Sequence, residues 1–329
     1  MRSEAPTLPA DLSPETAELM ARVLAEDGPQ PDPTMLAPHE GRALSERTNR
    51  RWNRDLPMLA VRSSVTLAVD PELGNAACRL EVLIPENAGK GAILFIHGGG
   101  FAFCSPETHE RCARVLAIES GLTVLMPDYR LAPEHPYPAG LKDCVAALRQ
   151  VFVATADVGV EAGPLLVAGD SAGANLALAA LLHEQARNKN EVAGALLFYG
   201  TYDRDFETYS YRRFADGPGL TLGKMQRYWA WYADPVETEV DALCCPLLAS
   251  DAALQALPPL HLMAAGVDPL LSDSVNLASR FEALGRPERL AIVPGVTHGF
   301  LQNTIDLAAA RDALHRAGLD AKRMAGIMT

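Results

Sequence analysis

One pentapeptide, Gly169-Asp170-Ser171-Ala172-Gly173, has the spacing that a nucleophilic serine requires. The apolar run 165–168 before it is typical of a buried strand, and the small and aliphatic residues 175–182 after it are typical of a helix. A strand, a sharp turn and a helix form the context of a Gly-x-Ser-x-Gly nucleophile elbow. The two glycines permit a tight turn around a serine with strained torsions, at the start of a helix. A purely structural turn rich in Gly, Ser and Ala is the alternative.

A nucleophilic serine needs a base and a carboxylate that orients this base, and in such a fold both follow the serine in the chain. The chain has eight histidines, and His298 alone follows the serine in a short loop, after an expected strand at 289–293. The others precede the serine, lie in helical patterns or begin a strand. Asp268 follows another expected strand, whereas Asp273 is the fallback and fits better as a helix cap. We therefore expect Ser171, His298 and Asp268 to converge.

A second motif, His97-Gly98-Gly99-Gly100-Phe101, follows an expected buried strand at 91–96. Consecutive glycines leave main-chain N–H groups unhindered, and such groups can stabilise the oxyanion of an acyl-transfer reaction. We expect Gly98 and Gly99 to supply two donors and Ala172 to supply the third. A flexible turn is the alternative, whereas a phosphate-binding loop is disfavoured because no Gly-Lys-Ser/Thr follows.

Three other residues of these motifs are expected to support the site rather than to react. We expect the side chain of His97 to hold the glycines in place by hydrogen bonding, not to transfer a proton. Gly100 completes the glycine motif, and Asp170 lies next to the serine. No metal ligand is assigned, because the cysteines are scattered without metal-ligand spacing.

Composition indicates an ordinary globular protein and disfavours some partners. The 329 residues are 48% hydrophobic and 21% charged, which suits one large α/β domain or two smaller ones. The net charge of −12 argues against nucleic acid and against an anionic membrane surface as partners. The N-terminus has no apolar h-region and the chain has no run of 18 apolar residues, so we expect a cytoplasmic protein with reduced cysteines.

The pattern along the chain predicts an α/β fold with a mostly parallel sheet. Period-two alternation at 61–69 and 77–84 indicates an antiparallel hairpin at a sheet edge. Apolar strands then alternate with helices, as expected for parallel strands covered by helices on both faces. The expected strands are 92–96, 122–126 and 165–168, and the expected helices are about 106–119 and 139–153.

Two segments fall outside this alternation. Residues 1–55 contain a candidate amphipathic helix at 13–26 and a proline-rich stretch, and we expect a cap, with a disordered tail as the alternative. Residues 200–258 interrupt the alternation, and eleven of the 20 aromatic residues lie between Phe198 and Tyr232. These rings either line an apolar pocket or pack the insertion onto the main domain. The expected organisation is an N-terminal cap segment, 1–55, and a catalytic domain, 56–329, in which 200–258 form a second cap segment.

Five motifs together resemble the hormone-sensitive-lipase-like esterases, the bacterial family IV of the α/β-hydrolases. They follow that family's order and spacing over residues 58–320. The motifs are His97-Gly98-Gly99-Gly100, the stretch from Asp128-Tyr129-Arg130 to Pro138-Ala139, Gly169-Asp170-Ser171-Ala172-Gly173, Asp268-Pro269-Leu270 and His298-Gly299-Phe300. The resemblance implies an α/β-hydrolase fold with a helical cap. It also implies a serine carboxylesterase that hydrolyses short-chain acyl esters through an acyl-enzyme, with no metal or organic cofactor.

The resemblance implies a small-molecule ester as the binding partner and a possible homodimer, and it leaves other activities open. The same apparatus cleaves amides in the arylacetamide-deacetylase branch. In the plant gibberellin receptor the fold serves as a small-molecule receptor, but there the catalytic histidine is missing, whereas His298 is present here.

Ala174 and Cys104 stand where glycine is usual in the family that the chain resembles. The first is expected to alter packing alone, and the second places a thiol near the site.

Overall fold

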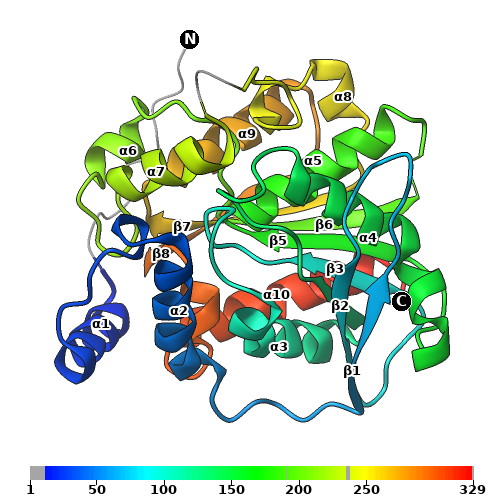
Figure 1. The fold of residues 1–329 in the computed structure, drawn as a ribbon, viewed down its shortest axis with the longest axis horizontal. Helices are drawn as coiled ribbons and strands as arrows, with labels where there is room; N and C mark the ends of the chain where they lie inside the picture. Colours follow the sequence, from blue (N-terminus) through cyan, green and yellow to red (C-terminus); the bar gives the residue numbers. More distant parts are fainter. Residues whose placement is uncertain (1–11, 190, 235–237, 328–329) are drawn as a thin grey trace.

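Eight strands form one sheet in the computed structural model, which describes residues 12–189, 191–234 and 238–327 (Figure 1). The strand order is β1-β2-β4-β3-β5-β6-β7-β8. β2 runs antiparallel to both of its neighbours, and the remaining pairs are parallel, as predicted. The strands are β1 Val61–Leu67, β2 Cys78–Ile84, β3 Ala92–Ile96, β4 Thr123–Pro127, β5 Leu165–Asp170, β6 Val192–Phe198, β7 Leu260–Val267 and β8 Leu290–Thr297.

From β3 onward, helices connect successive strands, as the alternating pattern predicts. Within the described ranges the α-helices are α1 Pro14–Asp27, α2 Pro38–Asn49, α3 Glu110–Ser120, α4 Ala139–Thr155, α5 Ala172–Gln185, α6 Tyr209–Arg213, α7 Leu222–Tyr232, α8 Asp251–Gln255, α9 Leu271–Ala283 and α10 Ala308–Met324. The 3-10 turns are η1 Pro33–Met35, η2 Arg50–Asn53, η3 Pro106–His109, η4 Ala156–Val158, η5 Pro246–Leu248 and η6 Phe300–Asn303. None of the helices in this described part is long and apolar enough to cross a membrane.

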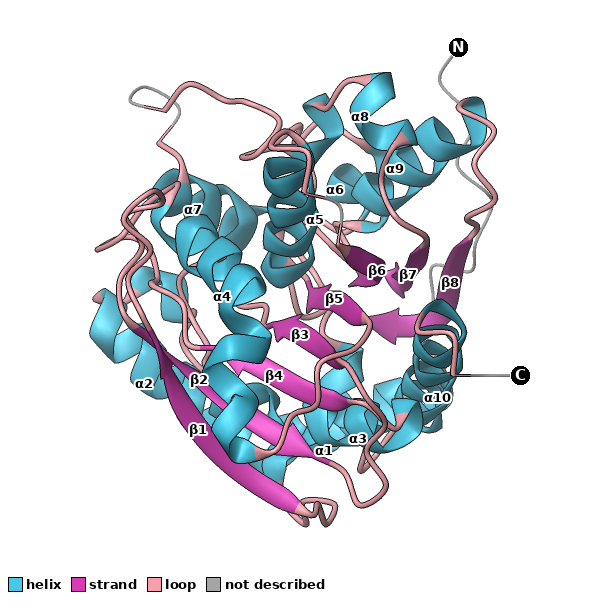
Figure 2. Cartoon of the chain, turned by 90° about the vertical axis from the view of Figure 1, so that its right-hand side faces the viewer, coloured by secondary structure: helices cyan, strands magenta, loops and turns pink. Residues whose placement is uncertain are grey.

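The sheet is covered on both faces, with α4, α5 and α9 over one face and α3 and α10 over the other (Figure 2). Alternate residues of β3 show why its whole sequence is apolar. Leu94 and Ile96 join the core cluster beneath α4 and α5, whereas Ile93 and Phe95 join the cluster beneath α3 and α10. All four side chains are fully buried. The sheet therefore presents its strand ends, rather than its faces, for a binding site.

The last strand is longer than predicted. β8 continues through Pro294 and Gly295 to Thr297 instead of ending at residue 293, and Val267 pairs with Thr297 beyond a bulge. The predicted loop is therefore largely strand. As a result, His298 directly follows the last residue of β8.

The N-terminal helices α1 and α2 lie at the end of the sheet to which the β7 and β8 arrowheads point (Figure 1). Their described part is ordered against the domain, so the disordered alternative is wrong there, whereas residues 1–11 of the predicted segment lie outside the described residues. The N–H of Ser13 donates to the Gly295 carbonyl at 2.9 Å. The Arg42 guanidinium donates to the carbonyls of Ala102 and Ala132, each at 2.9 Å.

The insertion that carries α6 and α7 lies at the same end of the molecule (Figure 1). Most of its aromatic rings are packing residues, because Tyr202, Tyr211 and Trp229 are almost completely buried. The ring of Tyr232 stacks on Phe101 of the main domain with 3.7 Å between centroids. The predicted alternative of ordinary packing therefore describes most of these rings.

Candidate active site

Ser171 lies in the turn between β5 and α5, with φ 55° and ψ −122°. L-residues rarely adopt such torsions. Neither flanking glycine leaves room for a side chain. A Cβ on Gly169 would lie 2.3 Å from the Gly173 carbonyl oxygen, and a Cβ on Gly173 would lie 2.0 Å from the Ile96 carbonyl oxygen. The N–H of Ser171 donates to the Phe198 carbonyl at 2.9 Å. The strained elbow predicted from the sequence is therefore present.

Three side chains from three strand ends meet at this elbow. Ser171 follows β5, Asp268 follows β7 and His298 follows β8. The Ser171 Oγ lies 2.8 Å from His298 Nε2, and His298 Nδ1 lies 2.7 Å from Asp268 Oδ2. The other oxygen of the fully buried Asp268 accepts the Leu270 N–H at 2.9 Å. Because a carboxylate only accepts hydrogen bonds, His298 carries its proton on Nδ1 and offers the Nε2 lone pair to the serine hydroxyl.

Asp273, the fallback for the orienting carboxylate, lies apart from this relay. It accepts the main-chain N–H groups of Tyr202 at 2.8 Å and of Asp203 at 3.3 Å. Burial raises the pKa of Asp273 to about 8. It occupies the first turn of α9, but the N-terminus of α9 has no side-chain cap, so the predicted capping role is wrong. Its hydrogen bonds instead tie the start of the insertion to α9.

The first peptide of the glycine loop, residues 97–101, is held on both sides. The Tyr129 hydroxyl donates to the His97 carbonyl at 2.8 Å, and the Gly98 N–H donates to Asp170 Oδ1 at 2.8 Å. A Cβ on Gly98 would lie 2.8 Å from Asp170 Oδ2 and 3.0 Å from the Ser171 Cβ, so Gly98 packs behind the nucleophile. The prediction that Gly98 supplies an oxyanion donor is therefore wrong, because its N–H is already donated to a carboxylate.

The next two peptides direct their N–H groups elsewhere. His97 Nδ1 lies 2.8 Å from the Gly98 carbonyl oxygen, and the Gly99 carbonyl accepts two N–H groups later in the loop. The C=O and N–H of a peptide point in opposite directions, so these bonds turn the N–H groups of Gly99 and Gly100 to the other side, where both glycines line a cavity. No described residue accepts a hydrogen bond from Gly99, Gly100 or Ala172 N–H.

His97 makes the contact that was expected of it. A carbonyl only accepts, so the His97 bond to Gly98 requires the proton on Nδ1. The ring is fully buried and stacks on Tyr129 with 4.4 Å between centroids. Burial, together with the nearby charge of His109, lowers the pKa of His97 to about 3. The ring is therefore neutral at physiological pH and holds the loop as a hydrogen-bond donor.

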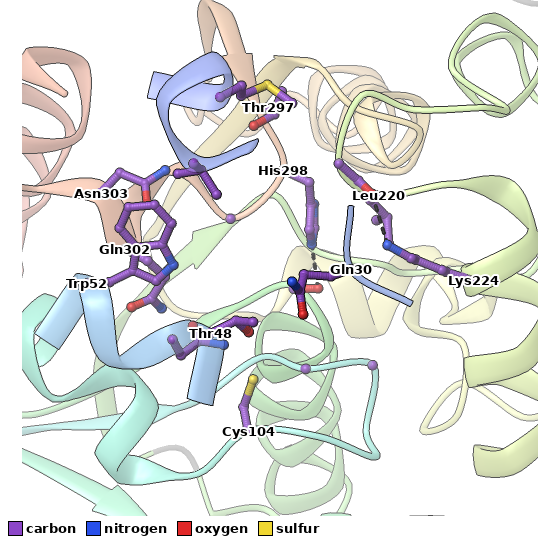
Figure 3. Close-up of a pocket in the computed structure, with 18 of the residues that line it drawn as sticks. Gln30, Thr48, Trp52, Cys104, Leu220, Lys224, Thr297, His298, Gln302 and Asn303 are labelled. Carbon is purple, nitrogen blue, oxygen red and sulfur yellow. Dashed lines mark hydrogen bonds between the residues drawn. The ribbon is translucent and has the colours of Figure 1, made fainter. Parts of the chain in front are cut away.

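Ser171 and His298 line a cavity of about 750 Å³. This volume is within the usual range for small-molecule sites. Trp52, Gln302 and Asn303 lie to one side of His298, whereas Leu220 and Lys224 lie to the other (Figure 3). Helix α1 contributes an apolar wall that includes Leu19, Met20 and Val23. Among the eleven rings of the aromatic region, Tyr228 is the one that lines this cavity within the described residues.

The two departures from the usual glycines have different surroundings. Cys104 lines the cavity, as its position in the sequence suggested, and adopts a left-handed φ of 70°. Burial raises the pKa of the Cys104 thiol to about 11, so it is overwhelmingly protonated at neutral pH. Ala174 is fully buried in α5, where its methyl group contributes to packing.

One residue near the nucleophile was missed by the sequence analysis. His109 was set aside because it precedes the serine, yet its Nε2 lies 3.3 Å from Asp170 Oδ1 and it lines the cavity. It lies where η3 meets α3 and is 3% exposed. Its position eight residues after the glycine motif 97–101 gave no spacing signal, since the contact forms only when the strand ends are brought together.

A mostly parallel sheet, a strained serine at a strand end and a neighbouring histidine and aspartate define the α/β-hydrolase class. Comparison with known proteins agrees, because residues 93–302 match a family described as alpha/beta hydrolase fold. The chain is 33% identical to the esterase LipI of Mycobacterium tuberculosis over 283 residues, which cover 84% of this chain and 87% of LipI. It is 35% identical to the carboxylesterase NlhH of the same species over 234 residues, 70% of this chain and 73% of NlhH.

Solved structures agree with these relatives. An ester-hydrolase, EH1AB1, from the metagenome of Lake Arreo superimposes with a TM-score of 0.87 at 31% identity, covering 96% of this chain and 99% of that one. A thermostable esterase from Pseudomonas putida gives 0.87 at 27% identity, covering 98% and 99%. The chain belongs to the hormone-sensitive-lipase-like esterases and is a carboxylic ester hydrolase.

Proposed function

We propose that this carboxylesterase works through a Ser171-His298-Asp268 triad and a covalent acyl-enzyme. The observation that carries the proposal is the continuous hydrogen-bonded relay from the Ser171 hydroxyl to the Asp268 carboxylate. His298 Nε2 takes the hydroxyl proton as Oγ attacks the ester carbonyl carbon, and Asp268 stabilises the imidazolium that forms. When the carbon–oxygen bond to the alcohol breaks, His298 returns this proton to the leaving alcohol oxygen.

The second half of the cycle repeats these steps with water. His298 takes a proton from water while the water oxygen attacks the acyl carbon of the acyl-enzyme. The bond to Ser171 Oγ then breaks, and His298 returns the proton to this oxygen. The products are a carboxylic acid and the free enzyme.

The oxyanion of both tetrahedral intermediates is assigned to the N–H groups of Gly99, Gly100 and Ala172. Gly100 takes the place predicted for Gly98, because the Gly98 N–H is donated to Asp170. Ala172 is the first residue of α5, so its N–H lies at the positive end of the helix dipole. Loss of one such donor typically costs about 3 to 4 kcal/mol of transition-state stabilisation.

Replacement of Ser171 by alanine tests the nucleophile. We expect kcat for p-nitrophenyl acetate to fall by at least about 10⁴-fold, because the remaining site can only assist water. A fluorophosphonate should label the parent at this residue and should not label Ser171→Ala. Ser64→Ala, on the exposed face of β1, is the matched control and should be fully active. An active or labelled Ser171→Ala would refute the assignment.

We also assign short-chain acyl esters as the preferred substrates. The support is steric: a Cβ on Gly100 would lie 2.3 Å from the Tyr228 ring, so this ring limits the space directly beside the proposed oxyanion donors. With p-nitrophenyl esters of increasing acyl length, kcat/KM should be highest for chains of about two to six carbons. A value that rises steadily to twelve carbons would contradict this preference.

A further inference from the structure

The Asp170 carboxylate gathers three hydrogen-bond donors that the proposed reaction does not use. Its Oδ1 accepts the Gly98 N–H at 2.8 Å and lies 3.3 Å from His109 Nε2. Its Oδ2 accepts the Tyr199 hydroxyl at 3.4 Å. The carboxylate is 5% exposed and lies immediately before the nucleophile in the chain. Such a buried charge requires partners, and these three groups supply them.

His109 is fixed through both of its ring nitrogens. Nε2 faces a carboxylate oxygen, which only accepts, and therefore carries a proton. Nδ1 lies 2.9 Å from Thr108 Oγ1, which itself accepts the Ser105 N–H at 3.0 Å and donates to the Ser105 carbonyl at 2.8 Å. Thr108 and His109 are 4% and 3% exposed. The ring cannot turn without breaking a buried hydrogen bond.

The charge of this pair is consistent with that geometry. The pKa of Asp170 is below its ordinary value. Burial alone would raise this pKa, but the charge and hydrogen bond of His109, together with the Gly98 N–H, outweigh burial. Asp170 is therefore an ionised acceptor. An ionised acceptor holds the Gly98 N–H more strongly than a neutral one would.

The hydrogen bonds that fix the 97–98 peptide also restrain the proposed oxyanion donors, because the peptides are joined through the main chain. Asp170 fixes the 97–98 peptide from its N–H side while Tyr129 fixes it from its C=O side. The adjoining peptide carries the N–H of Gly99, so its direction depends on that first peptide. Glycine torsions are otherwise permissive. Without such a restraint, the donors would be displaced from the positions that stabilise charge.

We propose that His109 and Asp170 form a positioning pair that sets the direction of the oxyanion donors. His109 acts through Asp170 and not on the reacting atoms. The proposal rests on the proposed function, because these donors affect the rate only if Ser171 forms tetrahedral intermediates.

Two amide variants separate positioning from simple polarity. In His109→Gln the amide nitrogen reaches close to the position of Nε2 and can still donate to Asp170. In His109→Asn the amide reaches only the position of Nδ1, so it can keep the Thr108 contact but loses Asp170. His315→Asn is the matched control, since His315 forms a similar His–carboxylate pair with Glu119 on the exposed surface, 2.7 Å apart.

We expect His109→Asn to lower kcat by about 10- to 100-fold while KM changes by less than about 2-fold, because small displacements of donors cost rate rather than ground-state binding. His109→Gln should retain kcat within about 3-fold, and His315→Asn should match the parent. The second-order rate of fluorophosphonate labelling should fall in parallel with kcat. Thr108→Val, which releases the other ring nitrogen, should lower kcat in the same direction and serves if His109→Asn does not fold.

Parental kcat in folded His109→Asn, or equal losses in the Asn and Gln variants, would overturn the positioning role. A failure of the proposed function is distinguishable from this result. In that case the fluorophosphonate would not label the parent enzyme at Ser171. Labelled parent enzyme with insensitive His109 variants would refute the positioning pair alone.

Discussion

Asp268→Asn tests the proposed relay at the bond that determines which nitrogen of His298 carries the proton. Asp268 uses Oδ1 to accept the Leu270 N–H and Oδ2 to face His298 Nδ1. In the asparagine variant, the amide oxygen must stay with Leu270, because a donor there would face another N–H. The amide NH₂ group then faces His298 Nδ1. The histidine must accept at Nδ1 and carry its proton on Nε2, which leaves no acceptor for the Ser171 hydroxyl.

The expected loss follows from this exchange of tautomers. In a serine triad with the same connectivity, the Asp-to-Asn change lowers kcat by about 10⁴-fold, or about 5.4 kcal/mol. We expect a similar loss in kcat for p-nitrophenyl acetate near pH 7, with KM nearly unchanged. The side chain is isosteric and fully buried, so the fold should be retained. Measurements of kcat and of the melting temperature on the same preparations check both points.

Asp273→Asn is the matched control, because it is another buried aspartate after β7, five residues further along. It binds the N–H groups of Tyr202 and Asp203, not a histidine. Its kcat should therefore stay within about 10-fold of the parent. If Asp268→Asn kept more than about a tenth of parental kcat, the tautomer argument would be wrong. The same conclusion would follow if Asp273→Asn were the more damaging change.

Three further predictions concern the surroundings of the relay. A maleimide should inactivate the enzyme slowly at pH 7 and about tenfold faster for each pH unit up to pH 9, because burial raises the pKa of the Cys104 thiol to about 11. Cys104→Ala should resist the reagent, and equal sensitivity of both proteins would contradict this prediction. The lowered pKa of His97, about 3, means that the unfolded chain takes up the proton first as pH falls below about 6.5. Stability should therefore drop by about 2 kcal/mol from this group by pH 5, and His97→Asn, compared by melting temperature at pH 7.5 and pH 5, should show a smaller drop. Gly100→Ala, whose methyl group would lie 2.3 Å from the Tyr228 ring, should lower kcat by at least about 10-fold, and parental kcat would rule out the assigned loop geometry.

The sequence predicted the elements and the three relay residues because local chemistry and chain order determine them. Ser171 lies between an apolar strand and a helix of small residues, and few histidines follow it in the chain. Parallel strands bring their carboxyl ends to one edge, so Asp268 and His298 could be placed beside Ser171 without coordinates. The observed separations of 2.8 Å and 2.7 Å agree with that placement.

The direction of individual peptides could not be predicted in the same way. Three consecutive glycines are equivalent in the sequence, and what distinguishes Gly98 is a carboxylate 72 positions later that takes its N–H. The contact of His109 with the same carboxylate is similarly long-range. The extension of β8 through Pro294 and Gly295 was missed because both residue types usually interrupt strands, whereas pairing here resumes after a bulge.

The strain at the nucleophile explains why α5 is so completely buried. A non-glycine residue with the torsions of Ser171 costs of order 1–3 kcal/mol, and it persists only where its surroundings fix it. Asn175, one turn into the helix, donates to the carbonyls of Thr201 at 2.9 Å and Cys244 at 3.0 Å, so it ties α5 to the insertion. The burial of nearly every α5 side chain then anchors the helix on the sheet. The same contacts hold the Ala172 N–H at a fixed place, so the packing that maintains the strain also maintains a proposed oxyanion donor.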